Sequence, residues 1–282
     1  MDKIKIMTDT TSDITLEMAS ELGIHLIPIN IILEDVSYKD KYELGTDEFY
    51  EKMSSMDGMP KTSQITVQEH IDEFKKFSDD HSIIYFTIAS QASGTHQSAH
   101  IAREAVLDEN PDADITIIDG RSFSYAYGYW VMEAAKKLKE GAGKEEIIEF
   151  IENGLAKTDV RFVVDTLDYL KKGGRISGTA KLFATVLDIK PILTIENGLV
   201  MTVDKVRGFK NAVSKSADTA IAETENLDTI VVVHGNDEEK GNMVVETLKS
   251  KADIGNIVVG VVGPTVGSHT GPGVIGIIYF KK

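Results

Sequence analysis

The sequence contains no cysteine, and no part of it is apolar over the length of a membrane span. The lack of thiols excludes disulfides, cysteine catalysis and cysteine-ligated zinc or iron–sulfur centres. A membrane-spanning helix needs roughly 20 apolar residues, and the N-terminal residues, MDKIKIMTDT, have no long apolar segment of the kind a secretory signal needs. We therefore expect a cytoplasmic protein that does not span a membrane.

Basic residues are also in deficit, and only in one part of the chain. Residues 1–160 carry 15 Lys and Arg against 31 Asp and Glu, whereas residues 161–282 carry 15 against 14. Neither part has the basic excess that binding to a phosphate backbone requires, so nucleic acid is not an expected partner. The acidic part favours solubility, with a docking face for a basic partner as the alternative. An anionic ligand would need local hydrogen-bond donors.

Strands and helices are predicted to alternate through the first half of the chain. Apolar runs at residues 4–7, 83–88 and 115–119 predict buried strands, and amphipathic segments between them predict helices. This alternation favours a mainly parallel sheet with helices on both faces. Beyond residue 160, two apolar runs flank the turn at residues 196–198, which predicts a hairpin and hence a mixed sheet.

We therefore predict an α/β protein of two domains. Residues 1–160 would form an N-terminal α/β/α sandwich with a mainly parallel sheet, and residues 161–282 a C-terminal α+β domain with a mixed sheet. Three segments are predicted to have less regular structure. Residues 25–33 are expected to form one strand with Pro28 at an edge or bulge, residues 34–45 a polar loop, and residues 263–273 a glycine-rich loop.

The segment that follows the apolar run at residues 83–88 has the composition of an anion site. Ala92-Ser93-Gly94-Thr95 leads into a helix whose predicted buried side includes Ile101 and Val106. In open α/β sheets, ligands bind beyond the carboxyl ends of the strands, and the free N–H groups of a helix start favour an anion. Ser93 and Thr95 add hydroxyl donors, and Gly94 allows close approach of the backbone. We predict that this loop holds the anionic end of a ligand.

Three further segments could add polar groups to that site. The turn at residues 8–13, TDTTSD, follows the first strand, and Thr62-Ser63-Gln64 precedes a capping box formed by Thr66 and Glu69. In both turns the side chains either cap nearby N–H groups or contact the ligand. The loop at residues 263–273 either is a plain glycine-rich turn or aims His269 at the ligand, and the second interpretation is favoured.

Two motifs are considered and set aside. Residues 271–276 fit the pattern G-x-G-x-x-G but are not followed by a βαβ unit, which excludes a dinucleotide site. His96 and His100 are four residues apart on a predicted helix, like a zinc-binding pair. Gln97 stands where the H-E-x-x-H motif has Glu, so two surface histidines are the favoured interpretation and no metal site is predicted.

Five short segments together resemble the DegV family of bacterial proteins. They are DTTSD at residues 9–13, TSQ at 62–64, ASGT at 92–95, GGRI at 173–176 and GSHTGPG at 267–273. Each segment is weak alone, but five in the right order, spread from the first strand to the last, are specific. One departure is Ser268, where the family usually has Thr, and this exchange keeps a hydroxyl.

The resemblance implies a two-domain protein that binds a long-chain fatty acid between its domains, with no cofactor and no catalytic turnover of its own. The carboxylate would be held by Thr62, Ser93 and His269. The further candidate ligand-binding residues are Ser63, Gly94, Thr95, Arg175 and Thr270. Arg175 could close the site, brace a neighbouring loop or face a partner, and a structural role is favoured. Several members present the acid to an ATP-dependent fatty-acid kinase, so such a kinase is a possible partner.

Physical chemistry agrees with this implication, and it leaves one alternative. A chain of about sixteen carbons gains on the order of 10 kcal/mol on burial, and hydroxyls, helix-start N–H groups and an imidazole can hydrogen-bond a carboxylate. The alternative is an esterase or lipid hydrolase with Ser93 as nucleophile, His269 as base and Asp9 as the residue that orients it. The sequence lacks the G-x-S-x-G motif of such enzymes, so the carrier is favoured.

Overall fold

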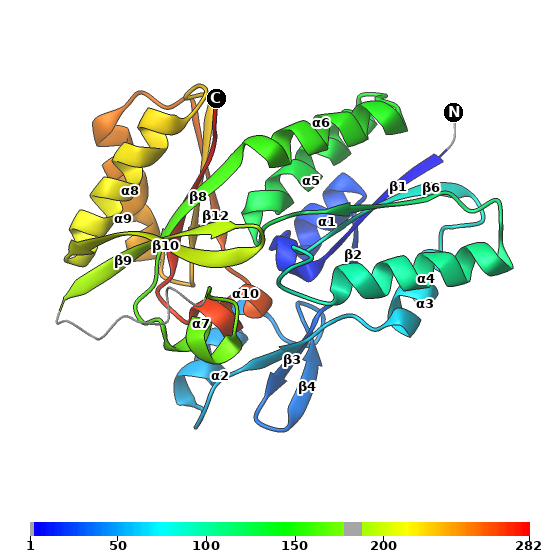
Figure 1. Cartoon of the computed structure of the whole chain (residues 1–282), viewed down its shortest axis with the longest axis horizontal. Helices are drawn as coiled ribbons and strands as arrows, with labels where there is room; N and C mark the ends of the chain where they lie inside the picture. Colours follow the sequence, from blue (N-terminus) through cyan, green and yellow to red (C-terminus); the bar gives the residue numbers. More distant parts are fainter. Residues whose placement is uncertain (1–2, 178–187) are drawn as a thin grey trace.

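The computed structural model describes residues 3–177 and 188–282, and within these residues three sheets organise the chain (Figure 1). The first sheet has four strands in the order β2-β1-β6-β7 and is parallel throughout. Its strands are β1 (Lys3–Asp9), β2 (His25–Ile27), β6 (His81–Thr87) and β7 (Ile115–Asp119). The second is a mixed six-stranded sheet, and the third is a small antiparallel sheet in the order β4-β3-β5.

Helices cover both faces of the four-stranded sheet. Along β6, Ile83 and Tyr85 pack in one apolar cluster with residues of α3 and α4, whereas Ile84 and Phe86 pack in another with residues of α5. A strand with both sides buried must be apolar at successive positions, which explains the continuous apolar run in its sequence. The covering helices are α1 (Leu16–Leu22), α3 (Val67–Lys75), α4 (Thr95–Glu109), α5 (Tyr125–Lys139) and α6 (Lys144–Lys157). The predicted N-terminal α/β/α sandwich is confirmed.

The six-stranded sheet is formed by later segments, in the order β10-β9-β8-β13-β11-β12. Its strands are β8 (Thr158–Val163), β9 (Ile189–Glu196), β10 (Leu199–Arg207), β11 (Thr229–His234), β12 (Asn256–Val261) and β13 (Ile275–Phe280). The predicted hairpin is β9–β10, whose turn residues Asn197 and Gly198 both have positive φ, as a tight hairpin turn requires. Only β11 and β12 run parallel to each other, so the predicted mixed sheet is confirmed.

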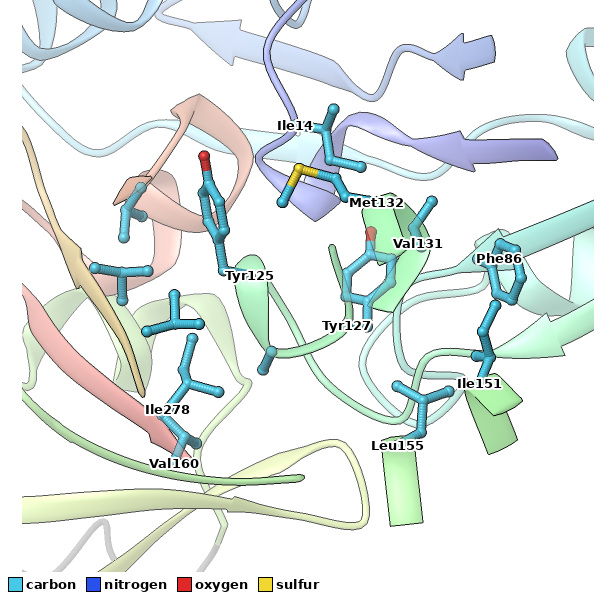
Figure 2. Packing of buried hydrophobic residues seen from close by; sticks show 14 of the residues in the cluster. Ile14, Phe86, Tyr125, Tyr127, Val131, Met132, Ile151, Leu155, Val160 and Ile278 are labelled. Atoms are coloured by element: carbon cyan, nitrogen blue, oxygen red, sulfur yellow. The ribbon is translucent and has the colours of Figure 1, made fainter. Parts of the chain in front are cut away.

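The six-stranded sheet has a different neighbour on each face. The helices α8 (Phe209–Glu223) and α9 (Glu238–Lys251) cover one face. The other face joins the apolar cluster that contains Phe86, so one core extends from sheet to sheet. In Figure 2, Tyr125 and Tyr127 of α5 lie between Phe86 and the pair Val160 and Ile278. Residue 160 lies within β8, and the division of the chain into two domains there stays a prediction.

Three predictions of local structure in the first half of the chain are wrong. Residues 25–33 do not form one strand, because Pro28 separates β2 from β3 (Asn30–Leu33), which lies in a different sheet. Where we expected a loop, β4 (Val36–Lys39) pairs with β3 through a turn in which Glu34 has a φ of 54°, without the glycine that would have signalled it. Ile101 is 49% exposed, because α4 buries its small residues instead.

Among the described residues, no helix is long and apolar enough to cross a membrane.

Candidate ligand-binding site

A cavity of about 390 Å³ lies between the four-stranded and six-stranded sheets. Most of its wall is apolar and comes from both sheets and from α5 and its neighbouring segments. Representative wall residues are Ile88, Phe123, Ala126, Val160, Val233 and Ile278. Ser93 and His269, which are 176 residues apart in the sequence, both line this cavity, as do Thr62, Ser63, Gly94, Arg175 and Thr270. The structure therefore brings together all but one of the predicted site residues.

His269 lies on a short helix, α10 (Pro264–Thr270), and not in the loop that we predicted. Nε2 of His269 is 2.9 Å from Oγ1 of Thr62, a residue of β5 (Lys61–Ser63). Pro264 occupies the first turn of α10. A backbone N–H there would have no partner within the helix, so the missing N–H of proline costs nothing, and this signal could have revealed the helix. In Figure 1, α10 lies beside α7 (Asp168–Gly173), whose last residue packs against the imidazole.

The imidazole of His269 is neutral near pH 7. Burial, with a smaller contribution from the positive charge of Arg175, lowers the pKa of His269 to about 4. Its Nδ1 is buried and has no hydrogen-bond partner among the described residues. A proton on Nδ1 would be left unpaired there, so the favourable tautomer carries its proton on Nε2 and donates it to Thr62. The Thr62 hydroxyl then keeps its own hydrogen to donate elsewhere.

Gly173 is the reason that the imidazole can occupy this position. A Cβ atom added at Gly173 would lie 2.3 Å from Nδ1 of His269, closer than non-bonded atoms approach. Any larger residue at position 173 must therefore displace the ring.

The loop after β6 is shaped by local hydrogen bonds. Ser93 Oγ accepts a hydrogen bond from the Thr95 backbone N–H at 3.2 Å and lies 3.0 Å from Thr95 Oγ1, so local hydrogen bonds hold Ser93 just before α4, whose N-cap residue is Gly94. Thr95 is fully buried, does not line the cavity, and accepts from the N–H of Ile65 at 3.4 Å. A Cβ at position 94 would lie 1.9 Å from Oε1 of Gln64, so a larger residue there would displace the end of that exposed side chain. Ser93 faces the cavity, and Thr95 fixes it from behind.

Arg175 joins two of the segments that surround the polar end. Its Nε donates to the carbonyl oxygen of Ala92 at 3.1 Å, and its Nη1 donates to that of Gly173 at 2.5 Å. Burial lowers the pKa of Arg175, and a guanidinium stays charged even so. Arg175 thus braces the Ser93 loop against the end of α7, while its charge lies at the cavity.

The two remaining candidates are placed differently from each other. Ser63 is an exposed residue of β5 at the rim of the cavity. Thr270 is buried at the end of α10, where its hydroxyl donates to the carbonyl oxygen of Val266 at 3.1 Å. The Thr270 hydrogen is therefore already used within the helix.

Buried acids of the N-terminal sandwich hold the start of α10, a feature that the sequence did not reveal. Asp13 accepts a hydrogen bond from the Gly263 N–H at 3.0 Å, and Asp40 accepts one from the Thr265 hydroxyl at 2.5 Å. Tyr50 donates to the carbonyl oxygen of Val262 at 3.0 Å. Negative charge at a helix N-terminus is favourable. The sandwich thereby sets the position of the helix that carries His269.

These acids titrate abnormally because they are fully buried. Burial raises the pKa of Asp13 to about 7, against the opposing effects of Lys41 and of the hydrogen bond from Ser124. Burial also raises the pKa of Asp40. In the turn at residues 8–13, Thr11 lines the cavity, while Asp9 accepts from the N–H groups of Thr11 and Ile88, so this turn serves both capping and the site.

The apolar wall separates this cavity from a second, more polar one. The second cavity has a volume of about 640 Å³ and lies beside the β9–β10 turn. Ala126, Val160 and Ile195 line both cavities. These three side chains therefore form a partition between the apolar interior and a polar space beyond it.

The fold and the cavity define a class of two-sheet α/β proteins with an internal apolar binding site that polar groups close at one end. The chain belongs to the DegV family: the family model described as "Uncharacterised protein, DegV family" matches residues 3–282. A DegV domain-containing protein from Caldanaerobacter subterraneus subsp. tengcongensis is 36% identical, and the alignment covers 100% of both chains. Another from Clostridium acetobutylicum is 35% identical, with 99% of this chain and 98% of the relative covered.

Solved structures of the family have the same architecture. A fatty-acid-binding DegV family protein from Thermus thermophilus superimposes with a TM-score of 0.88 at 28% identity, covering 99% of this chain and 100% of the other. A stearic-acid-binding protein from Eubacterium ventriosum has a TM-score of 0.87 at 27% identity, covering 99% and 98%. DegV, a fatty-acid-binding protein from Bacillus subtilis, has a TM-score of 0.84 at 28% identity over 100% of both chains.

Proposed function

We propose that this protein binds one long-chain fatty acid in the cavity between its sheets and carries it without chemical turnover. The observation that carries the proposal is a largely apolar cavity lined by Thr62, Ser93 and His269, of which Thr62 and His269 are hydrogen-bonded to each other. The fatty acids bound by the relatives from Thermus thermophilus and Eubacterium ventriosum support it. Because burial yields about 0.8 kcal/mol per methylene group, the acyl chain supplies most of the affinity.

The polar end supplies neutral donors and one fixed cation for the carboxylate. The Thr62 hydroxyl, oriented by Nε2–H of His269, has a hydrogen to donate toward the cavity. The Ser93 hydroxyl has one as well when the Thr95 hydroxyl is the donor in the bond between them. Arg175, which lines the cavity and braces the Ser93 loop, adds its positive charge. Hydrogen bonds to a charged group contribute about 1.5–3 kcal/mol each, which offsets the cost of removing a carboxylate from water. Gly94 and Thr95 act through the position of Ser93.

The arrangement of hydrogen bonds argues against the hydrolase alternative. A serine hydrolase needs Ser93 bonded to His269 and His269 bonded to an acid. Here His269 Nε2 is paired with Thr62, and Nδ1 has no partner among the described residues. Asp9 instead accepts from backbone N–H groups and from the Tyr127 hydroxyl at 2.8 Å.

A fatty-acid kinase is the partner that the sequence resemblance predicts, and we propose it as the consumer of the bound acid. A carboxylate held by hydroxyls, one of which is oriented by the imidazole of His269, can be transferred or phosphorylated without first breaking a buried lysine ion pair. Purified fatty-acid kinase with ATP should form acyl-phosphate only when the loaded protein is present. Equal product formation from free fatty acid alone would contradict this part of the proposal.

The binding function is tested by organic extraction of the purified protein followed by mass spectrometry. We expect close to one long-chain fatty acid per chain. Ser93→Ala should weaken rebinding of that acid to delipidated protein about 10- to 100-fold, because one hydrogen bond to a charged group is lost. A hydrolase would instead release product from an activated ester in a burst that Ser93→Ala abolishes while binding persists. Absence of fatty acid in the extract, together with no rebinding, would refute the proposal.

A further inference from the structure

Two histidines of α4 face each other outside the cavity. His96 and His100 are four residues apart, in the first and second turns of the helix, and their Nε2 atoms are 3.1 Å apart. Both side chains are partly exposed, and neither lines the cavity between the sheets. The proposed binding of a fatty acid therefore leaves this pair unexplained.

The separation of the two nitrogens matches that of two ligands on one metal ion. Zinc binds imidazole nitrogen at about 2.0–2.1 Å, so two nitrogens in a tetrahedral site lie about 3.3 Å apart. The observed separation is 3.1 Å, so both rings could bind an ion after a shift of a few tenths of an ångström. Histidines at this spacing on one helix face are a known source of two zinc ligands.

A buried hydroxyl orients one of the two rings. Nδ1 of His96 lies 2.8 Å from Oγ1 of Thr87, a fully buried residue at the end of β6. With its proton on Nδ1, His96 donates to that hydroxyl and turns an unprotonated Nε2 toward His100. Metal-binding histidines commonly have such a partner on the other ring nitrogen.

The charges around the pair also suit a cation. The carboxylates of Asp119 and Glu104 favour a positive charge near the pair, and Arg103 opposes it. Among the described residues, no group of three His, Asp or Glu side chains is arranged around a metal position, so solvent must complete the coordination.

We propose that His96 and His100 bind one divalent ion of the class that prefers imidazole, such as Zn²⁺, through their Nε2 atoms, with water as the remaining ligands. Two Zn–N bonds form, and the hydrated ion releases the water molecules that these bonds and its change to tetrahedral coordination displace. The proton shared between the rings moves to Nδ1 of His100, so both rings stay neutral and no net proton is released.

Titration of metal-free protein with Zn²⁺ in a chelator competition assay tests the site. We expect one ion per chain, an affinity at least tenfold lower for His100→Gln and for His96→Gln, and wild-type affinity for His81→Gln. His81 is the matched control because it lies at the start of β6, away from the α4 pair, and contacts the carboxylate of Asp80. Thr87→Val, which keeps the shape but removes the ring partner, should lower the affinity about tenfold or more. In NMR spectra, zinc should shift the ring signals of His96 and His100.

Two results would overturn the proposal. One is the absence of saturable binding up to about 1 mM zinc, the weak end of specific association. The other is an equal loss of affinity in His81→Gln and His100→Gln. Circular dichroism of each variant separates loss of the site from loss of the fold. Because the pair lies outside the cavity, either result leaves fatty-acid binding untouched.

Discussion

The polar end of the cavity and its apolar wall are built in different ways. The polar groups come from a short strand, a loop and a short helix, and they depend on hydrogen bonds between residues far apart in the sequence, such as Thr62 and His269. The wall comes from long regular elements, β8, β11, β13 and α5, and requires only apolar side chains of the right volume. Changes at the polar end should therefore affect all acids alike, whereas changes in the wall should discriminate between chain lengths.

The largest expected contrast is in titration, because the polar end has an imidazole and the wall has none. The pKa of His269 is lowered to about 4 in the folded protein, from about 6.5 when unfolded. A lowered histidine pKa contributes stability that is present above pH 6.5 and lost as the pH falls toward 4, here about 3 kcal/mol. Urea unfolding should therefore show that wild type loses more stability between pH 7 and 4 than His269→Gln.

The acids at the start of α10 do not affect the difference in stability between wild type and His269→Gln. The pKa of Asp13 is raised to about 7, so its contribution has the opposite sign, but it is present in both proteins and cancels in the difference. Equal acid sensitivity of wild type and His269→Gln would mean that the imidazole is charged in the native protein, and the tautomer assigned above would be wrong.

Gly173→Ala should damage the polar end next most strongly. An ideal Cβ at position 173 would lie 2.3 Å from Nδ1 of His269, so the new methyl group must displace the imidazole. We expect affinity for laurate, palmitate and stearate to fall about 10- to 100-fold for all three, the effect of losing a hydrogen bond to a charged group. Isothermal titration of delipidated protein measures it.

The neighbouring glycine provides the control for Gly173→Ala. Gly174 has a φ of +73° and nothing within 4 Å of an added Cβ. Asn tolerates that backbone conformation, so Gly174→Asn should bind fatty acids like the wild type. If Gly174→Asn weakens binding as much as Gly173→Ala, the loop as a whole matters and the contact with His269 does not.

The wall should respond differently. Val160 lies on the partition between the two cavities, and Val160→Phe should fill the end of the apolar space. Each methylene group that no longer fits costs about 0.8 kcal/mol, roughly a fourfold loss. Stearate should therefore lose about tenfold in affinity while laurate changes little. Val160→Ala should extend the tolerated length, and a uniform loss for all chain lengths in Val160→Phe would remove the distinction between end and wall.

The sequence predicted the polar end better than the wall. Ser93 follows a buried strand, and a loop at the carboxyl end of a parallel strand is a ligand position whatever else the chain does. Thr62 and His269 are hydrogen-bonding residues in short motifs whose order resembles a known family. The wall residues could not be predicted, because which side of β8 faces a cavity depends on how two sheets pack, and apolar runs look alike on either side.

Contacts between distant segments escaped prediction for the same reason. Asp13 and Gly263 are 250 residues apart, and in the sequence each has an ordinary local explanation as a capping acid or a turn glycine. The glycines around Pro264 suggested a loop, and the proline that begins α10 was given too little weight. Local patterns thus gave the element types, and the packing of the sandwich against α10 had to come from the structure.

The smallest expected effect separates hydroxyls that serve the ligand from one that serves the fold. Thr270 donates to Val266 within α10, so Thr270→Val should change fatty-acid affinity by no more than about twofold. Thr62→Val has the same shape change but removes the partner of His269, and it should cost about tenfold or more. Equal losses in the two variants would mean that the Thr270 hydroxyl turns to the carboxylate on binding. The polar end would then include Thr270, and the distinction between hydroxyls that serve the ligand and one that serves the helix would disappear.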